Sequence, residues 1–106
     1  METIICGSGN ASIDEVGGQV DRLLGVALEP HESSYFGGGY LTVTTELDEE
    51  IKVVDNSVED GDGEVTYPEF AGHAVIVEIE ETERGDELVG KLAGAPDLYL
   101  LKRVTW

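Results

Sequence analysis

The sequence has few basic residues. Six lysines and arginines stand against 23 aspartates and glutamates, which gives the 106-residue chain a formal net charge of −17. A surface of this charge repels nucleic acid and anionic membranes, so we expect direct binding to neither, and it attracts basic proteins. Solubility, including adaptation to a salty cytoplasm, is an alternative explanation of the charge, and mimicry of nucleic acid is a third.

Cysteine and histidine are also scarce. Cys6 is the only cysteine, which excludes an internal disulfide, and its place in an apolar segment predicts a packed core residue. His31 and His73 are the only histidines and lack zinc-ligand spacing. Carboxylates are so numerous that their number gives no indication of acid–base catalysis. The sequence therefore predicts neither an enzyme nor a cofactor.

Long hydrophobic runs are absent. No apolar stretch approaches the roughly 20 residues that a membrane-spanning helix needs. Residues 1–6 lack the basic start and long apolar stretch of a secretion signal, so a cytoplasmic location is expected. Hydrophobic residues still make up 41% of the chain, which is enough for one core. We therefore expect residues 1–106 to form a single acidic domain.

Hydrophobic periodicity predicts two helices. The first covers residues 12–24, begins with an S-x-x-E capping box at Ser12 and ends at Gly25. The second covers residues 83–93, with Thr82 as its cap. Each helix has a single apolar stripe, so both should pack on one face of a sheet.

Five strands are predicted around these helices. They cover residues 3–6, 40–45, 51–54, 74–80 and a last segment from 98 toward 106, while residues 29–34 are expected to form a polar connection. The order β-α-β-β-β-α-β predicts an α+β fold with two helices packed on one face of a mostly antiparallel sheet. The two ends of the chain echo each other, as in ferredoxin-like split βαβ folds.

An acidic loop over residues 58–69 resembles the calcium loop of EF-hand proteins. Glu69 would fill the last ligand position, but Val58 stands at the first one and has no side-chain oxygen. Predicted strands rather than helices flank the loop, so we expect no calcium site of the EF-hand kind. A calcium-binding module remains an alternative, with Asp60, Asp62, Glu64 and Glu69 as its oxygen donors.

Two neighbouring features predict a protein interface. Aromatic residues among the glycines of residues 35–40 would supply apolar anchors, and the acidic stretch 46–64 would supply a charged rim. Neutralising Asp48, Glu49 and Glu50 together should slow association and leave folding almost unchanged. The side chains expected to bind the partner are Tyr35, Phe36, Tyr40, Glu46, Asp48, Glu49, Glu50, Asp60, Asp62 and Glu64.

One resemblance supports this interpretation. Residues 32–40 read ESSYFGGGY, and strands, an acidic loop with Pro68-Glu69-Phe70, a further strand and a helix follow. This arrangement resembles a group of small acidic bacterial proteins, some of which are similar to immunity proteins of polymorphic toxin systems. The resemblance implies that the protein has no enzymatic activity. It also implies that the protein binds tightly to a toxin domain, often a basic nuclease. It assigns no site residues.

The leading hypothesis is therefore a non-enzymatic protein-binding domain whose acidic surface docks a basic protein, such as a toxin or a nucleic-acid-binding protein. An immunity or inhibitor protein fits this description. The alternatives are the calcium-binding module and an acidic, salt-adapted domain of unrelated function. The sequence does not define an oligomeric state.

Overall fold

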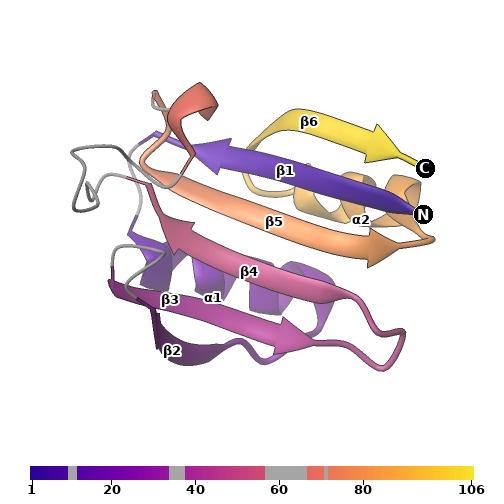
Figure 1. The fold of residues 1–106 in the computed structure, drawn as a ribbon, viewed down its shortest axis with the longest axis horizontal. Helices are drawn as coiled ribbons and strands as arrows, with labels where there is room; N and C mark the ends of the chain where they lie inside the picture. Colours follow the sequence, from indigo (N-terminus) through magenta and orange to yellow (C-terminus); the bar gives the residue numbers. More distant parts are fainter. Residues whose placement is uncertain (10–11, 34–37, 57–66, 71) are drawn as a thin grey trace.

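The chain folds into one sheet and two helices (Figure 1). The computed structural model describes residues 1–9, 12–33, 38–56, 67–70 and 72–106. No helix in these ranges is long and apolar enough to cross a membrane. The elements, in chain order, are β1 (Glu2–Ser8), α1 (Ile13–Leu24), β2 (Glu29–Ser33), β3 (Gly38–Thr44), β4 (Glu50–Asp55), the 3₁₀ turn η2 (Pro68–Phe70), β5 (Val75–Thr82), α2 (Gly85–Leu92) and β6 (Tyr99–Thr105).

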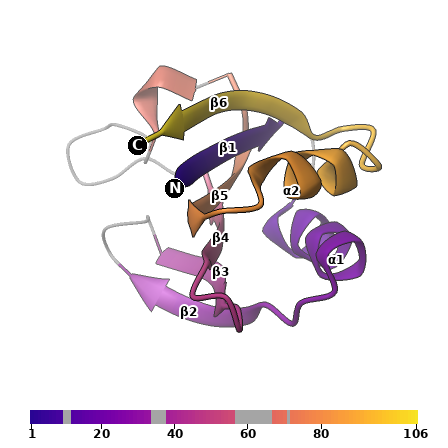
Figure 2. The same ribbon diagram turned by 90° about the vertical axis from the view of Figure 1, so that its right-hand side faces the viewer.

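The sheet is antiparallel throughout, with the strand order β2-β3-β4-β5-β1-β6. Figure 2 shows α1 and α2 side by side on one face of it, which confirms the α+β class and the predicted layering. The ferredoxin-like arrangement is not confirmed, because the strand order differs from it. In the described part of the chain the sheet has six strands, where the sequence predicted five.

The additional strand is β2, and the prediction of a polar connection over residues 29–34 was wrong. β2 pairs with β3 along its whole length, with Pro30 opposite Leu41. Its sequence, EPHES, has no apolar alternation, and proline is usually a strand breaker. β2 forms because β3 offers it backbone partners at the edge of the sheet, where proline is tolerated. A pairing of this kind leaves no local signal in the sequence.

The core lies between the sheet and the two helices. β1, β4 and β5 supply most of it, and α1 and α2 cover them with Val16, Val20, Leu24, Leu88 and Leu92. The strand residues of this core are Ile4, Cys6, Ile51, Val53, Val75, Val77 and Ile79, and all of them are buried.

The first helix has the predicted ends, and the second does not. Ser12 accepts a hydrogen bond from the backbone N–H of Glu15 at 3.2 Å, and Gly25 closes α1 in the left-handed conformation at φ 68°. α2 starts at Gly85, not at residue 83, and no side chain caps its first turn. Thr82 is not its cap: the Thr82 hydroxyl accepts a hydrogen bond from the backbone N–H of Arg84.

Two adjacent glycines inside α1 have different surroundings. Each should weaken the helix by up to ~1 kcal/mol relative to alanine. A methyl group on Gly17 would collide with the Cδ1 atom of Leu41 in β3, whereas a methyl group on Gly18 would meet only open space. Gly17 therefore lets α1 approach the sheet closely, and Gly18 has no such role.

The two glycines provide a matched pair of substitutions. We expect Gly18→Ala to raise the free energy of unfolding by up to ~1 kcal/mol. Gly17→Ala should stabilise the fold less than Gly18→Ala does, because the Cδ1 end of the Leu41 side chain must first move aside. Urea denaturation monitored by circular dichroism measures both. Equal stabilisation by the two changes would contradict this packing of α1 on β3.

Candidate functional site

The turn between β3 and β4 is held in one conformation by its own hydrogen bonds. The backbone N–H of Thr45 donates to the carbonyl of Glu49 at 2.9 Å, and the N–H of Asp48 donates to the carbonyl of Thr45 at 3.0 Å. Asp48 adopts the left-handed conformation, with φ 61°, which aspartate tolerates better than most residues. Leu47 at the tip is left exposed.

The end of β5 approaches this turn through a β-bulge. The register between β1 and β5 shifts between Glu2 and Ile4, and Glu81 on the bulged strand takes a left-handed φ of 60°. A bulge bends its strand and re-aims the side chains that follow. Here the chain continues into a buried Thr82 and then into Arg84 at the start of α2.

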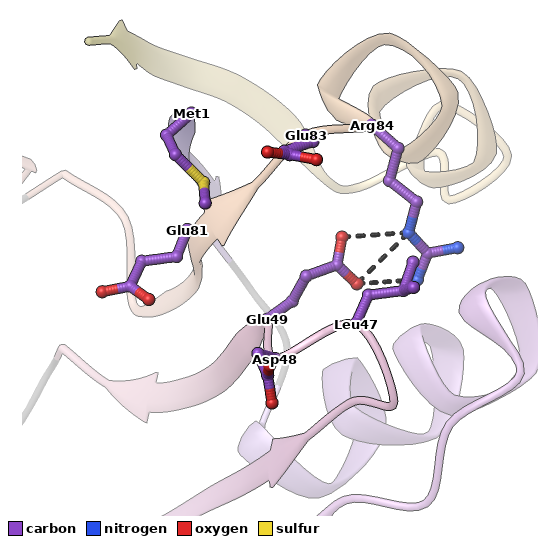
Figure 3. A pocket seen from close by; sticks show the side chains of 7 residues that line it. All are labelled: Met1, Leu47, Asp48, Glu49, Glu81, Glu83 and Arg84. Atoms are coloured by element: carbon purple, nitrogen blue, oxygen red, sulfur yellow. Dashed lines mark hydrogen bonds and ion pairs between the residues drawn. The ribbon is translucent and has the colours of Figure 1, made fainter.

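Glu49 and Arg84 form the central contact between the two segments (Figure 3). Arg84 donates from Nε to Oε2 of Glu49 at 2.9 Å and from Nη2 to Oε1 at 2.8 Å. The hydroxyl groups of Thr45 and Thr82 donate to the same carboxylate. Only 1% of Glu49 is exposed, so its charge is buried but fully hydrogen-bonded.

This network determines the protonation of Glu49. The hydrogen bonds from Arg84 lower the pKa of Glu49 from its ordinary value of 4.5 to about 2, although burial opposes the shift. Glu49 therefore stays ionised and is already neutralised by Arg84. The sequence placed Glu49 among the partner-binding side chains, but its carboxylate is buried and paired within the chain, and we expect its neutralisation to affect folding.

The same segments line a cavity of about 420 Å³ (Figure 3). Leu47 and Met1 beside it are 62% and 47% exposed. Within the described ranges, none of the exposed carboxylates around it, nor Glu46 on the same turn, forms a salt bridge. The cavity is lined by Met1, Leu47, Asp48, Glu49, Glu81, Glu83 and Arg84.

The structure brings together only some of the predicted interface residues. Glu46 and Asp48 lie on the turn as expected, and both are exposed. Tyr40 lies near the start of β3, five residues from the turn or about 17 Å along the strand, where its ring contacts His31. The predicted residues Tyr35, Phe36, Asp60, Asp62 and Glu64 lie outside the described residues.

Glu81 and Glu83 belong to the site but were missed from the sequence. They lie more than thirty residues after Asp48, and only the antiparallel pairing of β4 with β5 brings them alongside the turn. The sequence-based prediction of an interface rested on one continuous acidic stretch, residues 46–64. A second acidic stretch around residues 80–83 was visible, but nothing in the sequence indicated that the two meet.

The calcium alternative is tested only where its residues are described. Glu69 lies in η2 with its side chain exposed, 3.9 Å from the Nζ atom of Lys102. Among residues 1–9, 12–33, 38–56, 67–70 and 72–106, no three acidic, histidine or cysteine side chains are grouped so as to hold a metal ion. Asp60, Asp62 and Glu64, the other donors, lie outside these ranges.

Cys6 is a core residue, as predicted. It is buried among apolar side chains between the sheet and the helices, and this burial raises the pKa of its thiol to about 11. His73 packs beside Gly7. Gly7 follows Cys6 on β1, so these two residues face opposite sides of the sheet. The sheet therefore separates the thiol from this imidazole.

A second group of charges lies on the sheet face opposite the helices. Glu50 and Glu80 are directly opposite each other on β4 and β5, and Lys52 is opposite Glu78. Lys52 forms an ion pair with Glu50 at 3.2 Å, and the hydroxyl of Tyr67 donates to Glu78 at 3.2 Å. Burial and the Glu80 carboxylate raise the pKa of Glu78 to about 7. Glu50, a predicted interface residue, thus lies in this group rather than beside the cavity.

Glu49→Gln should destabilise the fold by roughly 2–4 kcal/mol, because it removes the buried carboxylate that pairs with Arg84. Glu46→Gln, on the same turn but exposed, should change the free energy of unfolding by less than about 0.5 kcal/mol. Urea denaturation at neutral pH measures both. Similar small effects would show that the ion pair is not needed.

The lowered pKa of Glu49 also sets a pH dependence. Its contribution to stability is complete above the ordinary value of 4.5 and is lost as the pH falls toward about 2. We therefore expect the stability of Glu49→Gln to depend less steeply on pH between 5 and 2 than that of the unchanged protein. Parallel curves over this window would contradict the assignment.

Glu78 should have the opposite pH dependence. Its raised pKa means that the folded chain binds the proton more tightly, so stability declines as the pH rises from 4.5 to about 7 and is then constant. Glu78→Gln should remove this decline and stabilise the protein at pH 8. Thermal unfolding across pH 4.5–8 tests this, with Glu83→Gln as the exposed control; an unchanged slope in Glu78→Gln would count against the crowding of Glu78 and Glu80.

Comparison with known proteins assigns no identity to this site. No protein-family model matches the chain, and no curated protein matches it. What the site does must therefore be inferred from its chemistry: a fixed turn, a buried ion pair, and exposed carboxylates around exposed apolar side chains.

Proposed function

We propose that this protein is a non-enzymatic binding domain and that the acidic cavity beside the β3–β4 turn docks a basic protein partner. One observation carries the proposal. Three exposed carboxylates line the cavity beside two exposed apolar side chains, Leu47 and Met1, and a fourth lies on the same turn; none forms a salt bridge in the described part of the chain. These carboxylates are Glu46, Asp48, Glu81 and Glu83.

The unpaired charge is what favours a cationic partner. Carboxylates at a shared cavity repel one another, and a lysine or arginine side chain from a partner would relieve that repulsion. Glu49 adds no attraction, because Arg84 neutralises it. Arg84 also donates from Nη1 to Glu87 at 3.1 Å, so each of its three nitrogens donates to a carboxylate of the same chain.

The rigidity of the site favours specific rather than diffuse binding. The turn and the end of β5 are joined through Glu49, Arg84 and Thr82, so the two segments that carry the rim carboxylates are held together before a partner arrives. Preformed sites lose less conformational entropy on binding. Exposed Leu47 at the tip is suited to act as an apolar anchor inside a charged rim.

The class of partner follows from the charge. A protein with a net charge of −17 is complementary to proteins that bind nucleic acid, such as nucleases. Covering the basic surface of a nuclease would block access of its substrate, so the proposed role is that of an inhibitor or immunity protein. The resemblance that includes residues 32–40 also supports this role.

The test compares two triple substitutions of equal charge. D48N/E81Q/E83Q removes three carboxylates from the cavity, and D14N/E32Q/D97N removes three exposed carboxylates elsewhere. Asparagine tolerates the left-handed conformation at position 48, so the turn should persist. With a partner captured from native lysate, the first variant should slow association at least about tenfold at low salt, and the second should slow it several times less.

Leu47→Ala should instead speed dissociation, since an anchor acts after docking. Stopped-flow or surface-plasmon kinetics at several salt concentrations separates these effects. Equal slowing by both triple variants would assign the attraction to net charge alone. No slowing by either would leave the charge as a solubility feature and reject the proposal.

A further inference from the structure

The β6 edge of the sheet is the most apolar surface in the described part of the chain. Four of the six large hydrophobic side chains that are exposed there belong to residues 99–106. Trp106 is 63% exposed and Val104 is 40% exposed. Residues 98–106 also contain no aspartate or glutamate, although the chain has 23.

The two edges of the sheet are protected unequally. The opposite edge, β2, carries Pro30 between two exposed acidic residues, and both devices discourage strand pairing. β6 has no proline, and each of its two basic side chains has an acidic neighbour within the chain. Arg103 binds Glu2 at 2.7 Å, and Lys102 lies 3.9 Å from Glu69.

The backbone groups of β6 that face outward can be identified from its register with β1. Met1 and Trp106 exchange two backbone hydrogen bonds, from Trp106 N to Met1 O and from Met1 N to Trp106 O. Hydrogen-bonded pairs alternate along an antiparallel ladder, so Val104 and Lys102 also face β1. The N–H and C=O groups of Arg103 and Thr105 therefore point away from the sheet.

We propose that β6 pairs antiparallel with β6 of a second copy of this chain. The outward backbone groups allow a register in which Arg103 of each copy exchanges hydrogen bonds with Thr105 of the other. Val104 then lies on the two-fold axis against its own copy. Lys102 lies opposite Trp106 of the second copy, where a cation–π contact is favourable.

Charge favours this register over the one centred on Arg103, and it favours a second copy of the chain as the strand that pairs with β6. A shift that centres the axis on Arg103 would place two guanidinium groups opposite each other, which is unfavourable. A second copy brings a strand that is equally free of carboxylates and is self-complementary. The two-fold axis is perpendicular to the sheet. No residue that lines the acidic cavity belongs to β6, so the cavity is not needed for the contact.

Thr105→Pro tests the pairing, because it removes an outward N–H without breaking the ladder to β1. Thr105→Val retains this N–H and is the matched control. Sedimentation equilibrium from micromolar to millimolar protein should show a dimer for the unchanged chain and for Thr105→Val, and a monomer for Thr105→Pro. Added salt should strengthen this dimer by screening repulsion between the copies, whereas it should weaken docking of a basic partner.

A second measurement needs no variant. On raising the protein concentration, the amide protons of Arg103 and Thr105 should become protected from hydrogen exchange, while those of Lys102 and Val104 are protected throughout. The single tryptophan, Trp106, should shift its fluorescence to the blue as it is covered. A monomer at every concentration and salt, or a dimer that Thr105→Pro leaves intact, would overturn the proposal.

Discussion

The ion pair between Glu49 and Arg84 is the contact on which one end of the molecule depends. It joins the β3–β4 turn to the start of α2, and the buried hydroxyl of Thr82 completes it from β5. A buried carboxylate is costly unless every oxygen is hydrogen-bonded, and here two threonines and a guanidinium meet that requirement. The same contact sets the positions of the carboxylates around the cavity.

The rest of the negative charge is distributed so that the fold can tolerate it. The core between the sheet and the helices is wholly apolar, and the carboxylates lie on turns, helix surfaces and the outer sheet face. On the outer face, Lys52 lies among Glu50, Glu78 and Glu80, and crowding shows there as the raised pKa of Glu78. Where exposed carboxylates form no salt bridge within the described residues, as around the cavity, a cation from a partner would be stabilising.

Local sequence signals predicted the elements that have strong periodicity or caps. α1 begins at the expected cap and ends at Gly25, and the alternation in residues 74–80 correctly indicated β5. β2 was missed because only its neighbour β3 makes it a strand. α2 was given a cap in Thr82, but that hydroxyl serves the Glu49 network, which connects residues 33 positions apart.

The candidate site was predicted in part for the same reason. Glu46 and Asp48 could be identified because they are adjacent in an acidic turn. Nothing local distinguished Glu49 from them, yet it is buried and they are exposed. That difference depends on Arg84, which approaches only after β4 and β5 have paired. Charge patterning in a sequence thus predicted a charged turn but not which carboxylate is structural.

A basic partner that docks at the cavity, as we propose, requires that cations bind there and not over the whole acidic surface. Nuclear magnetic resonance of the isotopically labelled protein, titrated with a short oligo-arginine peptide, tests it most directly. Saturable shift changes should concentrate at Leu47, Asp48, Glu81 and Glu83 and spare exposed acidic residues such as Asp14 and Asp97. Shift changes of equal size at all exposed carboxylates, without saturation, would contradict the claim.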